Sequence, residues 1–236
     1  MSDLFHPSHA YRFITEPEEV QYEPPKVDMA KAYCNSLEKA IRIFCIESGL
    51  IEDAFSVTDD EYCCYTLYNK YPSGASCLKN YEMAFELLAT SPLSKHTIRQ
   101  AHQCLMQSHL DKSVCGVWKQ RDNHVITRDG GVHYFCPHEH VESEMDRLIE
   151  IWNNLQGHFA WRAAWLHYHF ISIHPFVDGN GRIARILANI PFMNELGMPT
   201  CVRLSNRDKY FGILQSIDTD QLADVTPLAD FLVSLT

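Results

Sequence analysis

The sequence has little of several features that mark particular classes of protein. Positive charge is scarce, since 20 Lys and Arg stand against 30 Asp and Glu, a formal net charge of −10. Proteins that neutralise nucleic-acid phosphates need a basic face, so this balance argues against a nucleic-acid partner. Long apolar runs are also missing: the most apolar stretch, residues 159–173, falls short of the ~20 residues of a membrane-spanning helix and carries an arginine and two histidines. We therefore expect neither a nucleic-acid partner nor a membrane segment.

Paired cysteine motifs are absent as well. The nine cysteines are odd in number, scattered and never spaced as Cys-x-x-Cys, which argues against a disulfide framework or a zinc ribbon. The opening stretch, MSDLFHPSHAYRF, has neither the basic nor the apolar region of a secretory signal peptide. These observations predict a reduced, cytoplasmic protein, and a protein injected into the cytosol of another cell would have the same composition.

Long runs of alternating apolar and polar residues, the pattern of a half-buried sheet, are missing too, whereas helical spacing recurs. The clearest amphipathic helix follows Pro137, with apolar residues four and three apart at Val141, Met145, Leu148, Trp152 and Leu155. Other helices are expected within 27–54, at 78–90, after a cap at Ser94, over 159–173, from 180 to a bend or end at Pro191 with Gly197 as a cap, and near 206–217 and 226–235. With 46% hydrophobic residues, the chain is predicted to fold as an all-α globule.

The domain organisation predicted from these patterns is one globular unit with an appendage. Residues 1–25 are polar, spaced by prolines and rich in glutamate, so an extended acidic arm is expected there. We assign an N-terminal helical part to residues 26–110 and a core to residues 111–236. Within the core, a short hairpin is predicted where Val-Ile-Thr at 125–127 precedes Asp-Gly-Gly at 129–131.

Between the apolar helix at 159–173 and the next helix lies the segment HPFVDGNGRIAR, residues 174–185. Helical patterns flank its glycines, so the glycines serve a loop that leads into a helix. Such a loop directs backbone N–H groups outward at the positive end of the helix dipole. We expect Gly179, Asn180 and Gly181 to form a cradle for an anion.

Four side chains near this cradle fit phosphate chemistry. Arg182 and Arg185 are three residues apart and share a helix face, so both can bond phosphate oxygens. Asp178 would repel a phosphate unless a hard cation lay between them, so its presence implies Mg²⁺. His174 is the one nearby side chain able to take a proton near neutral pH. The structural alternative is a helix–loop–helix turn with a core histidine, but the gathering of all four within 12 residues favours a phosphate site.

This segment resembles the loop of the Fic (filamentation-induced-by-cAMP) family, His-Pro-Phe-x-Asp/Glu-Gly-Asn-Gly-Arg-x-x-Arg, and every specified position matches. The similarity extends over roughly residues 27–235 and includes Gly-Val-Trp-Lys at 116–119, where the family usually has Gly-x-Tyr/Phe-Arg, and the helix at 141–152. The doc-type kinase variant, which alters the second glycine, is less similar. The resemblance implies a Fic-type helical bundle with a small β-hairpin flap.

The resemblance also implies an activity. Fic enzymes usually transfer AMP from ATP to a hydroxyl of a protein Ser, Thr or Tyr and release pyrophosphate. By this resemblance His174 is the general base, Asp178 holds Mg²⁺ between the α- and β-phosphates, and the backbone of 179–181 cradles the phosphates. Arg182 and Arg185 grip the outer phosphates. The expected partners are ATP, Mg²⁺ and the side-chain hydroxyl of a target protein.

Two further regions take roles from the resemblance. The predicted hairpin resembles the family's flap, which pairs with the target peptide by strand addition. The flap residues are Val125, Ile126, Thr127 and Arg128. Tyr210 and Phe211 lie where relatives often have two aromatics, which implies an adenine region, although packing within a helix explains an aromatic pair equally well. Asp218 stands where some relatives have Asn, a departure at the adenine end.

A regulatory glutamate is implied in the same way. Many Fic proteins carry Ser/Thr-x-x-x-Glu-Gly/Asn on a helix, and its glutamate pairs with the second arginine of the loop and obstructs the γ-phosphate. Residues 48–53, SGLIED, resemble this motif, with Asp53 in place of Gly or Asn. Glu52 is therefore expected to pair with Arg185 and inhibit, with Glu47 as a rival and an exposed acid at a helix end as the structural alternative. The same glutamate can orient water and give de-AMPylation under other conditions.

Two alternatives to AMP transfer stay open at this point. The loop matches phosphates and says little about the base, so a Fic enzyme using another donor, such as UTP or CDP-choline, would carry the same residues. A non-catalytic helical module that binds a nucleotide or a protein is the second alternative, and the presence of His174 with both arginines counts against it. Helical surfaces permit a homodimer, which the sequence does not itself demonstrate.

Overall fold

The computed structural model describes residue 14 and residues 22–24, 36–75, 77–126, 130–218 and 223–236. Helices dominate this part of the chain, and its only strands form one two-stranded sheet, so the all-α prediction with a small hairpin is confirmed. The elements, in chain order, are α1 (Leu37–Ile51), α2 (Asp59–Tyr68), α3 (Leu78–Thr90), α4 (Lys95–Met106), β1 (His124–Ile126), β2 (Val132–Tyr134), the 3₁₀ turn η2 (His138–His140), α5 (Val141–Asn154), α6 (Phe159–Ile173), α7 (Asn180–Leu196), the 3₁₀ turn η3 (Leu204–Asn206), α8 (Arg207–Asp218) and α9 (Thr226–Val233).

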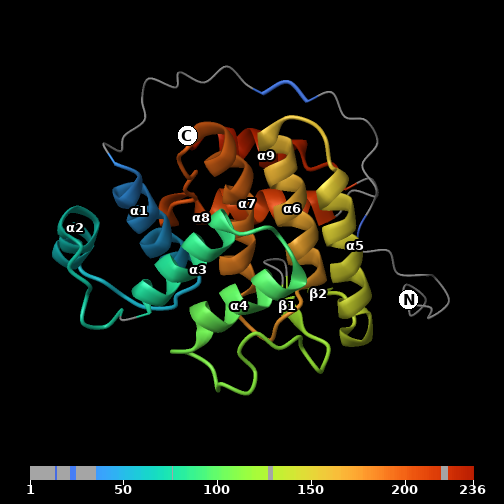
Figure 1. Ribbon diagram of the computed structural model, residues 1–236, viewed down its shortest axis with the longest axis horizontal. Helices are drawn as coiled ribbons and strands as arrows, with labels where there is room; N and C mark the ends of the chain where they lie inside the picture. Colours follow the sequence, from blue (N-terminus) through green and yellow to red (C-terminus); the bar gives the residue numbers. More distant parts are fainter. Residues whose placement is uncertain (1–13, 15–21, 25–35, 76, 127–129, 219–222) are drawn as a thin grey trace.

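The helices α6 and α7 pack against each other through the middle of the molecule (Figure 1). Helices α5 and α9 pack on α6, and helices α1, α3 and α4 pack on α7. Helix α6 is apolar on all sides because its neighbours cover it, and Trp165, Leu166 and Phe170 are at most 1% exposed. The loop that joins α6 to α7 is the segment with the predicted chemistry, and it is therefore anchored by the two most buried helices.

Local signals set the ends of the helices that carry this loop. Helix α6 ends at His174, whose backbone lies in the left-handed region with φ of 51°, and Pro175 cannot continue a helix. Helix α7 begins after Gly179, which has φ of 80°. This backbone angle favours glycine, and a Cβ at Gly179 would also lie 2.8 Å from Sδ of Met106, so the methionine would have to shift. At the far end of α7, Gly197 is the left-handed C-cap that the sequence predicts.

Of the bend or end expected at Pro191, the end does not occur. Helix α7 continues through Pro191 to Leu196. A proline inside a helix removes one hydrogen bond and costs ~3 kcal/mol or more. Residues Ile186, Leu187 and Phe192 around it are at most 1% exposed, and burial of this apolar surface against α6 offsets the cost. Tertiary packing therefore overrides the local signal of the proline.

The hairpin projects from the helical bundle. Strands β1 and β2 pair in antiparallel fashion, with Val125 opposite His133. Its apolar side chains are unusually exposed for the fold: Ile126 is 67% and Tyr134 is 55% exposed. Of the four predicted flap residues, Val125 and Ile126 lie on β1, whereas Thr127 and Arg128 lie outside the described residues.

The described residues of the N-terminal region contact the globule. Ile14 is buried in the hydrophobic core, and the hydroxyl of Tyr22 donates to Oδ1 of Asp230 at 2.8 Å. The division into an arm at 1–25, a helical part at 26–110 and a core at 111–236 stays a prediction. Within the described ranges, none of the helices combines the length and the hydropathy needed to cross a bilayer.

Candidate active site

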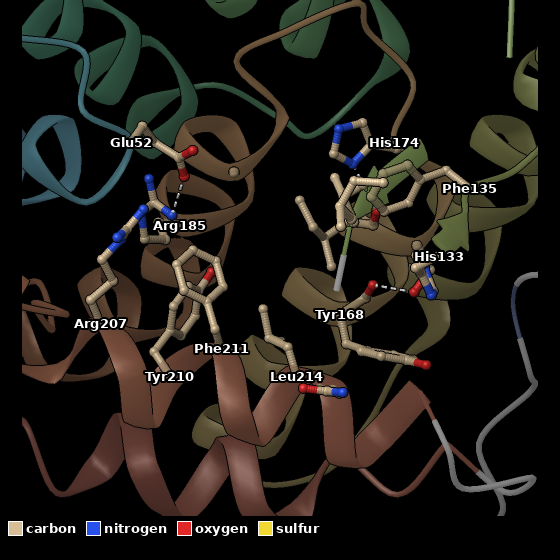
Figure 2. A pocket seen from close by; sticks show the side chains of 16 residues that line it. Glu52, His133, Phe135, Tyr168, His174, Arg185, Arg207, Tyr210, Phe211 and Leu214 are labelled. Atoms are coloured by element: carbon tan, nitrogen blue, oxygen red, sulfur yellow. Dashed lines mark hydrogen bonds and ion pairs between the residues drawn. The ribbon is translucent and has the colours of Figure 1, made fainter. Parts of the chain in front are cut away.

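A cavity of about 490 Å³ lies between the C-terminal end of α1, the hairpin, the α6–α7 loop and α8. Figure 2 shows His174 and Phe135 on one side of it and Glu52 with Arg185 on the other, with Tyr210, Phe211 and Leu214 of α8 between them. Four elements that are far apart in the sequence thus meet at one site. The described lining residues include His174, Gly181 and Arg185 of the predicted loop but not Asp178 or Arg182.

His174 is held in one orientation and one protonation state. Its Nδ1 lies 3.3 Å from the carbonyl oxygen of Ile171, and because a carbonyl can only accept, Nδ1 carries the ring proton. The opposite nitrogen, Nε2, is then left with a lone pair. The ring stacks on Phe135 with centroids 3.7 Å apart. Burial, and after it the positive charge of Lys119, lowers the pKa of His174 to about 3, so the imidazole is neutral at physiological pH.

The anion cradle at the start of α7 is braced from inside. The side-chain oxygen of Asn180 accepts the N–H of Phe176 at 2.9 Å, and its NH₂ group donates to the carbonyl of Phe176 at 2.9 Å. Asn180 is 1% exposed, so its side chain clamps the loop. The first N–H groups of α7 have no partner within the helix and point toward its N-terminal end. The cradle is therefore formed by backbone groups that Asn180 holds in place.

Asp178 and Arg182 form a pair beside the cavity. Nη2 of Arg182 lies 3.5 Å from Oδ2 of Asp178, and Oδ1 accepts the N–H of Gly179 at 2.6 Å. The Asp178 side chain is 60% exposed, whereas that of Arg182 is 6% exposed. No group of three or more His, Cys, Asp or Glu side chains suited to a metal occurs within the described ranges. An exposed single carboxylate fits Mg²⁺, which is commonly held by one or two carboxylates together with substrate phosphates.

Arg185 is 3% exposed and is bound by Ser48 of α1 and by Glu52, the C-cap of α1. Its Nε donates to the hydroxyl of Ser48 at 2.6 Å and its Nη2 to the carbonyl of Ser48 at 3.0 Å, while Nη1 forms an ion pair with Oε1 of Glu52 at 2.8 Å. Burial alone would lower the pKa of Arg185, but the attraction of the Glu52 carboxylate outweighs it and the net shift is upward. The guanidinium is thus charged and engaged by α1.

The carboxylate of Glu52 occupies the space directly above the cradle. A Cβ at Gly181 would collide with Oε1 of Glu52, so the absence of a side chain at Gly181 is what allows the carboxylate to lie at the start of α7. Glu47, the rival, is engaged elsewhere: it accepts from the hydroxyl of Tyr62 and from the N–H of Leu204, both at 2.8 Å. The geometry therefore places Glu52, and not Glu47, against Arg185, while the regulatory role remains a prediction.

The residue after Glu52 explains one departure from the family pattern. Asp53 has φ of 52°, in the left-handed region. Gly and Asn adopt this region most readily, and Asp is among the few other residues that tolerate it. The Gly or Asn of the family motif and the Asp of this chain thus satisfy the same backbone requirement.

The two predicted adenine-region residues differ in exposure. Tyr210 is 1% exposed and its hydroxyl shares a hydrogen bond of 2.7 Å with Nε2 of His167. Burial raises the pKa of Tyr210 to about 12. Phe211 is half-buried, and both residues line the cavity. Packing in the core explains the presence of an aromatic residue at Tyr210, whereas Phe211 offers an apolar face to a ligand. Asp218 ends α8, and its side chain is outside the described positions.

Sequence reasoning missed three residues that shape the site. Arg207 donates from Nε to the carbonyl of Ile51 at 2.9 Å and lines the cavity. Phe135 stacks on His174. Lys119 is buried near His174, and its place in the Gly-Val-Trp-Lys motif was the one signal in the sequence that could have drawn attention to it. The other two carry no local pattern, because only the fold brings them to the cavity.

The fold and the loop define the class of this protein. Residues 92–191 match the Fic/DOC family. A Fido domain-containing protein of Dictyostelium discoideum is 36% identical over 109 residues, which cover 44% of this chain and 71% of that protein. The chain belongs to the Fic/DOC family.

Named relatives and a solved structure refine this assignment. The protein adenylyltransferase Fic of Aedes aegypti is 34% identical over 92 residues, 37% of this chain. That match spans 18% of the Aedes protein, so most of the relative lies outside it. A crystal structure of a Fic domain-containing signaling protein from Bacteroides thetaiotaomicron has a TM-score of 0.70 and 25% identity, covering 84% of this chain and 82% of its own. At the level of the family, these relatives support a transferase role.

Proposed function

We propose that the protein is a protein adenylyltransferase that transfers AMP from ATP to a Ser, Thr or Tyr hydroxyl of a target protein. The observation that carries this proposal is the cavity in which neutral His174, the start of α7 and Arg185 converge. Family membership and the adenylyltransferase relatives support the same chemistry. The cavity offers a base at one side, an anion cradle beside it and an apolar wall from α8, which suit a hydroxyl, phosphates and a nucleobase.

His174 acts as the general base. The target hydroxyl oxygen attacks the α-phosphorus, its proton passes to Nε2 of His174, and the bond from the α-phosphorus to the bridging oxygen of pyrophosphate breaks. The low pKa keeps the imidazole unprotonated before substrate binds. Phosphates placed beside the ring favour its charged form and so strengthen the base when ATP is present. The histidine is thus neutral when free and more basic when it is needed.

The phosphates are bound by the chain and by a cation. The N–H groups of Asn180 and Gly181 donate hydrogen bonds at the positive end of α7, and that of Gly179 joins them when it leaves Oδ1 of Asp178. Arg185, once free of Glu52, bonds the outer phosphates. Asp178 is the residue that would hold Mg²⁺, and the bound ion would neutralise charge on the phosphates. Arg182 lies 3.5 Å from the Asp178 carboxylate, and we assign it, with Arg185, to the outer phosphates.

Glu52 inhibits the transfer by occupying the phosphate site. Its carboxylate bonds Arg185 and lies against Gly181, so the γ-phosphate and Glu52 cannot occupy this place together. Displacing the glutamate costs one charge-assisted bond, and bonds to charged groups contribute about 1.5–3 kcal/mol. With Glu52 in place, the same carboxylate can orient a water for removal of AMP from a modified target.

The target peptide is proposed to pair with the hairpin. Strand β1 presents Val125 and Ile126, both exposed, at the mouth of the cavity. An added strand would form main-chain hydrogen bonds with the edge of the hairpin and place a hydroxyl near His174. Thr127 and Arg128 are assigned to the same flap by the sequence.

Transfer of label from nucleotides tests the proposal. The wild-type chain, Glu52→Gly and Glu52→Gly with His174→Ala are incubated with Mg²⁺ and a human or bacterial lysate that supplies targets, using α-labelled ATP, α-labelled UTP and labelled CDP-choline in parallel. We expect label on protein from ATP with Glu52→Gly, less with the wild type and none with the double variant. Label from UTP or CDP-choline alone would show that the enzyme uses that donor in place of ATP. No label from any of the three would favour a binding module.

A further inference from the structure

A buried lysine lies behind the proposed base. Lys119, between α4 and β1, is 1% exposed. Its Nζ donates to Oδ1 of Asn123 at 2.6 Å and to the carbonyl oxygen of Ile173 at 3.3 Å. Lysine is seldom buried, because removing an ammonium group from water is costly unless its hydrogen bonds are replaced. The position of this lysine therefore calls for a reason beyond packing.

Lys119 and Asn123 bind the backbone on both sides of His174. The ammonium group bonds the carbonyl of Ile173, the residue before the histidine. The backbone N–H of Lys119 donates to the carbonyl of Pro175 at 2.8 Å. Nδ2 of Asn123 donates to the carbonyl of Phe176 at 3.1 Å. Three carbonyls that flank the histidine are thus held by two residues of one short segment.

The same segment connects the histidine to the hairpin. The carbonyl of Asn123 accepts the N–H of Phe135 at 3.4 Å, and the ring of Phe135 stacks on His174. The next residue, Cys136, donates its N–H to the carbonyl of Ser172 at 3.3 Å. The imidazole therefore lies between a backbone fixed by Lys119 and an aromatic ring fixed by Asn123.

The charges around the two groups are consistent with this arrangement. Burial lowers the pKa of Lys119 to about 8, while Cys136 and Asp122 act in the opposite direction. On the histidine, the charge of Lys119 adds to burial, and His133 of β2 acts in the same sense. Glu52 and Arg185 face His174 across the cavity as an ion pair.

We propose that Lys119, together with Asn123, is a positioning residue that clamps the backbone on both sides of His174 and keeps the imidazole aligned with its unprotonated nitrogen available for proton transfer. The part that concerns transfer rests on the proposed function, whereas the alignment of His174 does not. Lys119 touches neither substrate nor the reacting atoms, so it acts through the histidine.

Titration of His174 tests the alignment without any assay of transfer. The full chain is labelled with ¹³C at histidine Cε1, and the His174 signal is identified by its loss in His174→Ala. Replacing Lys119 by Met removes the charge and the two side-chain bonds while keeping an apolar chain of similar length. The pH is lowered only as far as near-ultraviolet circular dichroism shows the chain folded, and the midpoint is fitted from the onset of the shift. We expect the midpoint of His174 to rise by about one pH unit or more in Lys119→Met, because a nearby like charge is lost.

Two controls separate this effect from general disturbance. Lys119→Arg keeps the charge and the donors, so the midpoint is expected to stay near that of the wild type. Lys79→Met removes an exposed lysine of α3 and is expected to leave the titration unchanged. An unchanged midpoint in a folded Lys119→Met variant overturns the proposal.

Transfer kinetics then test the consequence for the reaction. In the Glu52→Gly background, we expect Lys119→Met to lower kcat by about 10- to 100-fold, to leave KM for ATP within about twofold, and to be rescued by Lys119→Arg. Equal loss with Lys119→Arg, or a change in KM alone, would contradict a positioning role. If the Glu52→Gly parent transfers no label from any nucleotide, the proposed function fails while the histidine titration still decides the alignment.

A second variant covers the case in which Lys119→Met does not fold. Asn123→Ala removes one partner of the lysine and the bond to Phe176 but leaves the ammonium group in place. We expect a loss of kcat of about three- to tenfold, with a near-ultraviolet circular dichroism spectrum like that of the wild type. An Asn123→Ala variant with full kcat and an unchanged His174 signal counts against the clamp.

Discussion

The α6–α7 loop and the β1–β2 hairpin meet at the cavity but differ in how many buried contacts and hydrogen bonds hold them in place. The α6–α7 loop is fixed by buried contacts: Asn180 clamps Phe176, Lys119 binds the carbonyl of Ile173, and both flanking helices lie in the core. The hairpin has exposed apolar side chains on both strands, such as Ile126 and Tyr134. Buried, hydrogen-bonded groups preorganise a site for one chemistry, whereas an exposed strand edge can pair with many sequences. Under the proposed function, the loop would determine the reaction and the hairpin the choice of target.

The largest expected effect comes from removing the proposed base, His174, which lies in the rigid α6–α7 loop. His174→Ala should lower transfer by about 10²–10⁴-fold, the usual contribution of general acid–base catalysis. Nucleotide binding, measured by calorimetry with ATP in the Glu52→Gly background, should persist because the cradle is intact. His96→Ala, an exposed histidine of α4, serves as the control with full activity. Retained transfer in His174→Ala would assign the base to another group.

Acid should lower the free energy of unfolding, because three histidines are buried in the neutral form. Burial lowers the pKa values of His102, His167 and His174 to about 4, 3 and 3, against ~6.5 in an unfolded chain. The unfolded chain therefore binds more protons below pH 6.5, so stabilisation that is full above this pH is lost as the pH falls toward 3–4. Each group contributes up to ~1.4 kcal/mol per pH unit, or ~4 kcal/mol per unit for the three.

Urea unfolding at pH 7, 6 and 5 measures this loss. The exposed His96 offers a control, since His96→Ala should leave the slope of the unfolding free energy against pH unchanged. A stability that does not change between pH 7 and 5 would show that these side chains are not buried in the neutral form.

Releasing the phosphate site should raise activity. Glu52→Gly removes the bond to Arg185 and should increase the initial rate of transfer by about 10- to 150-fold, as expected for a bond worth about 1.5–3 kcal/mol. Glu47→Gln is the matched control, because Glu47 is bonded to Tyr62 and Leu204 and not to Arg185. Equal activation by both variants would indicate that loosening α1, and not vacating the cradle, relieves inhibition.

Substitutions in the hairpin should weaken binding of the target protein and leave ATP binding at the loop unchanged. Ile126→Pro removes one N–H from the exposed strand and should raise KM for a protein target by about fivefold, the effect of roughly 1 kcal/mol. Affinity for ATP should stay the same, and Ile126→Ala, which keeps the N–H, should behave nearly as the wild type. A loss of ATP binding in Ile126→Pro would mean that the two regions are not independent.

The smallest expected effect concerns the turn after Glu52. Asp53 has a left-handed backbone with φ of 52°, which glycine adopts at a lower energetic cost. Asp53→Gly should therefore raise the free energy of unfolding by about 0.5–1 kcal/mol. The substitution also removes the ion pair between Asp53 and Arg207, which lie 3.4 Å apart. This pair is exposed and contributes little to stability. Thermal unfolding should show a rise of about 2–4 °C for 1 kcal/mol in a chain of this size. A fall in stability would show that the pair with Arg207 contributes more than the backbone.

The sequence predicts the helices well where spacing and caps agree. Apolar residues four and three apart predicted α5, and Ser94 caps α4 with its hydroxyl accepting the N–H of Thr97 at 3.1 Å. At Pro191, where the sequence predicts a bend or an end, the helix does not end, because packing against the neighbouring helices continues α7 beyond the local signal. The candidate loop was also visible in sequence, since its residues are contiguous.

What the sequence determined by itself is local: the all-α class, the ends of most helices, and a loop with a histidine, a carboxylate, glycines and two arginines. The tertiary structure decided which of these residues share a cavity. It turned Glu47 toward Tyr62 and set Lys119 and Phe135 around His174. It also placed Glu52, the C-cap of α1, 2.8 Å from Arg185, the pair that the family resemblance implied. Contacts between residues far apart in the chain depend on how whole helices pack, and no short pattern encodes that packing.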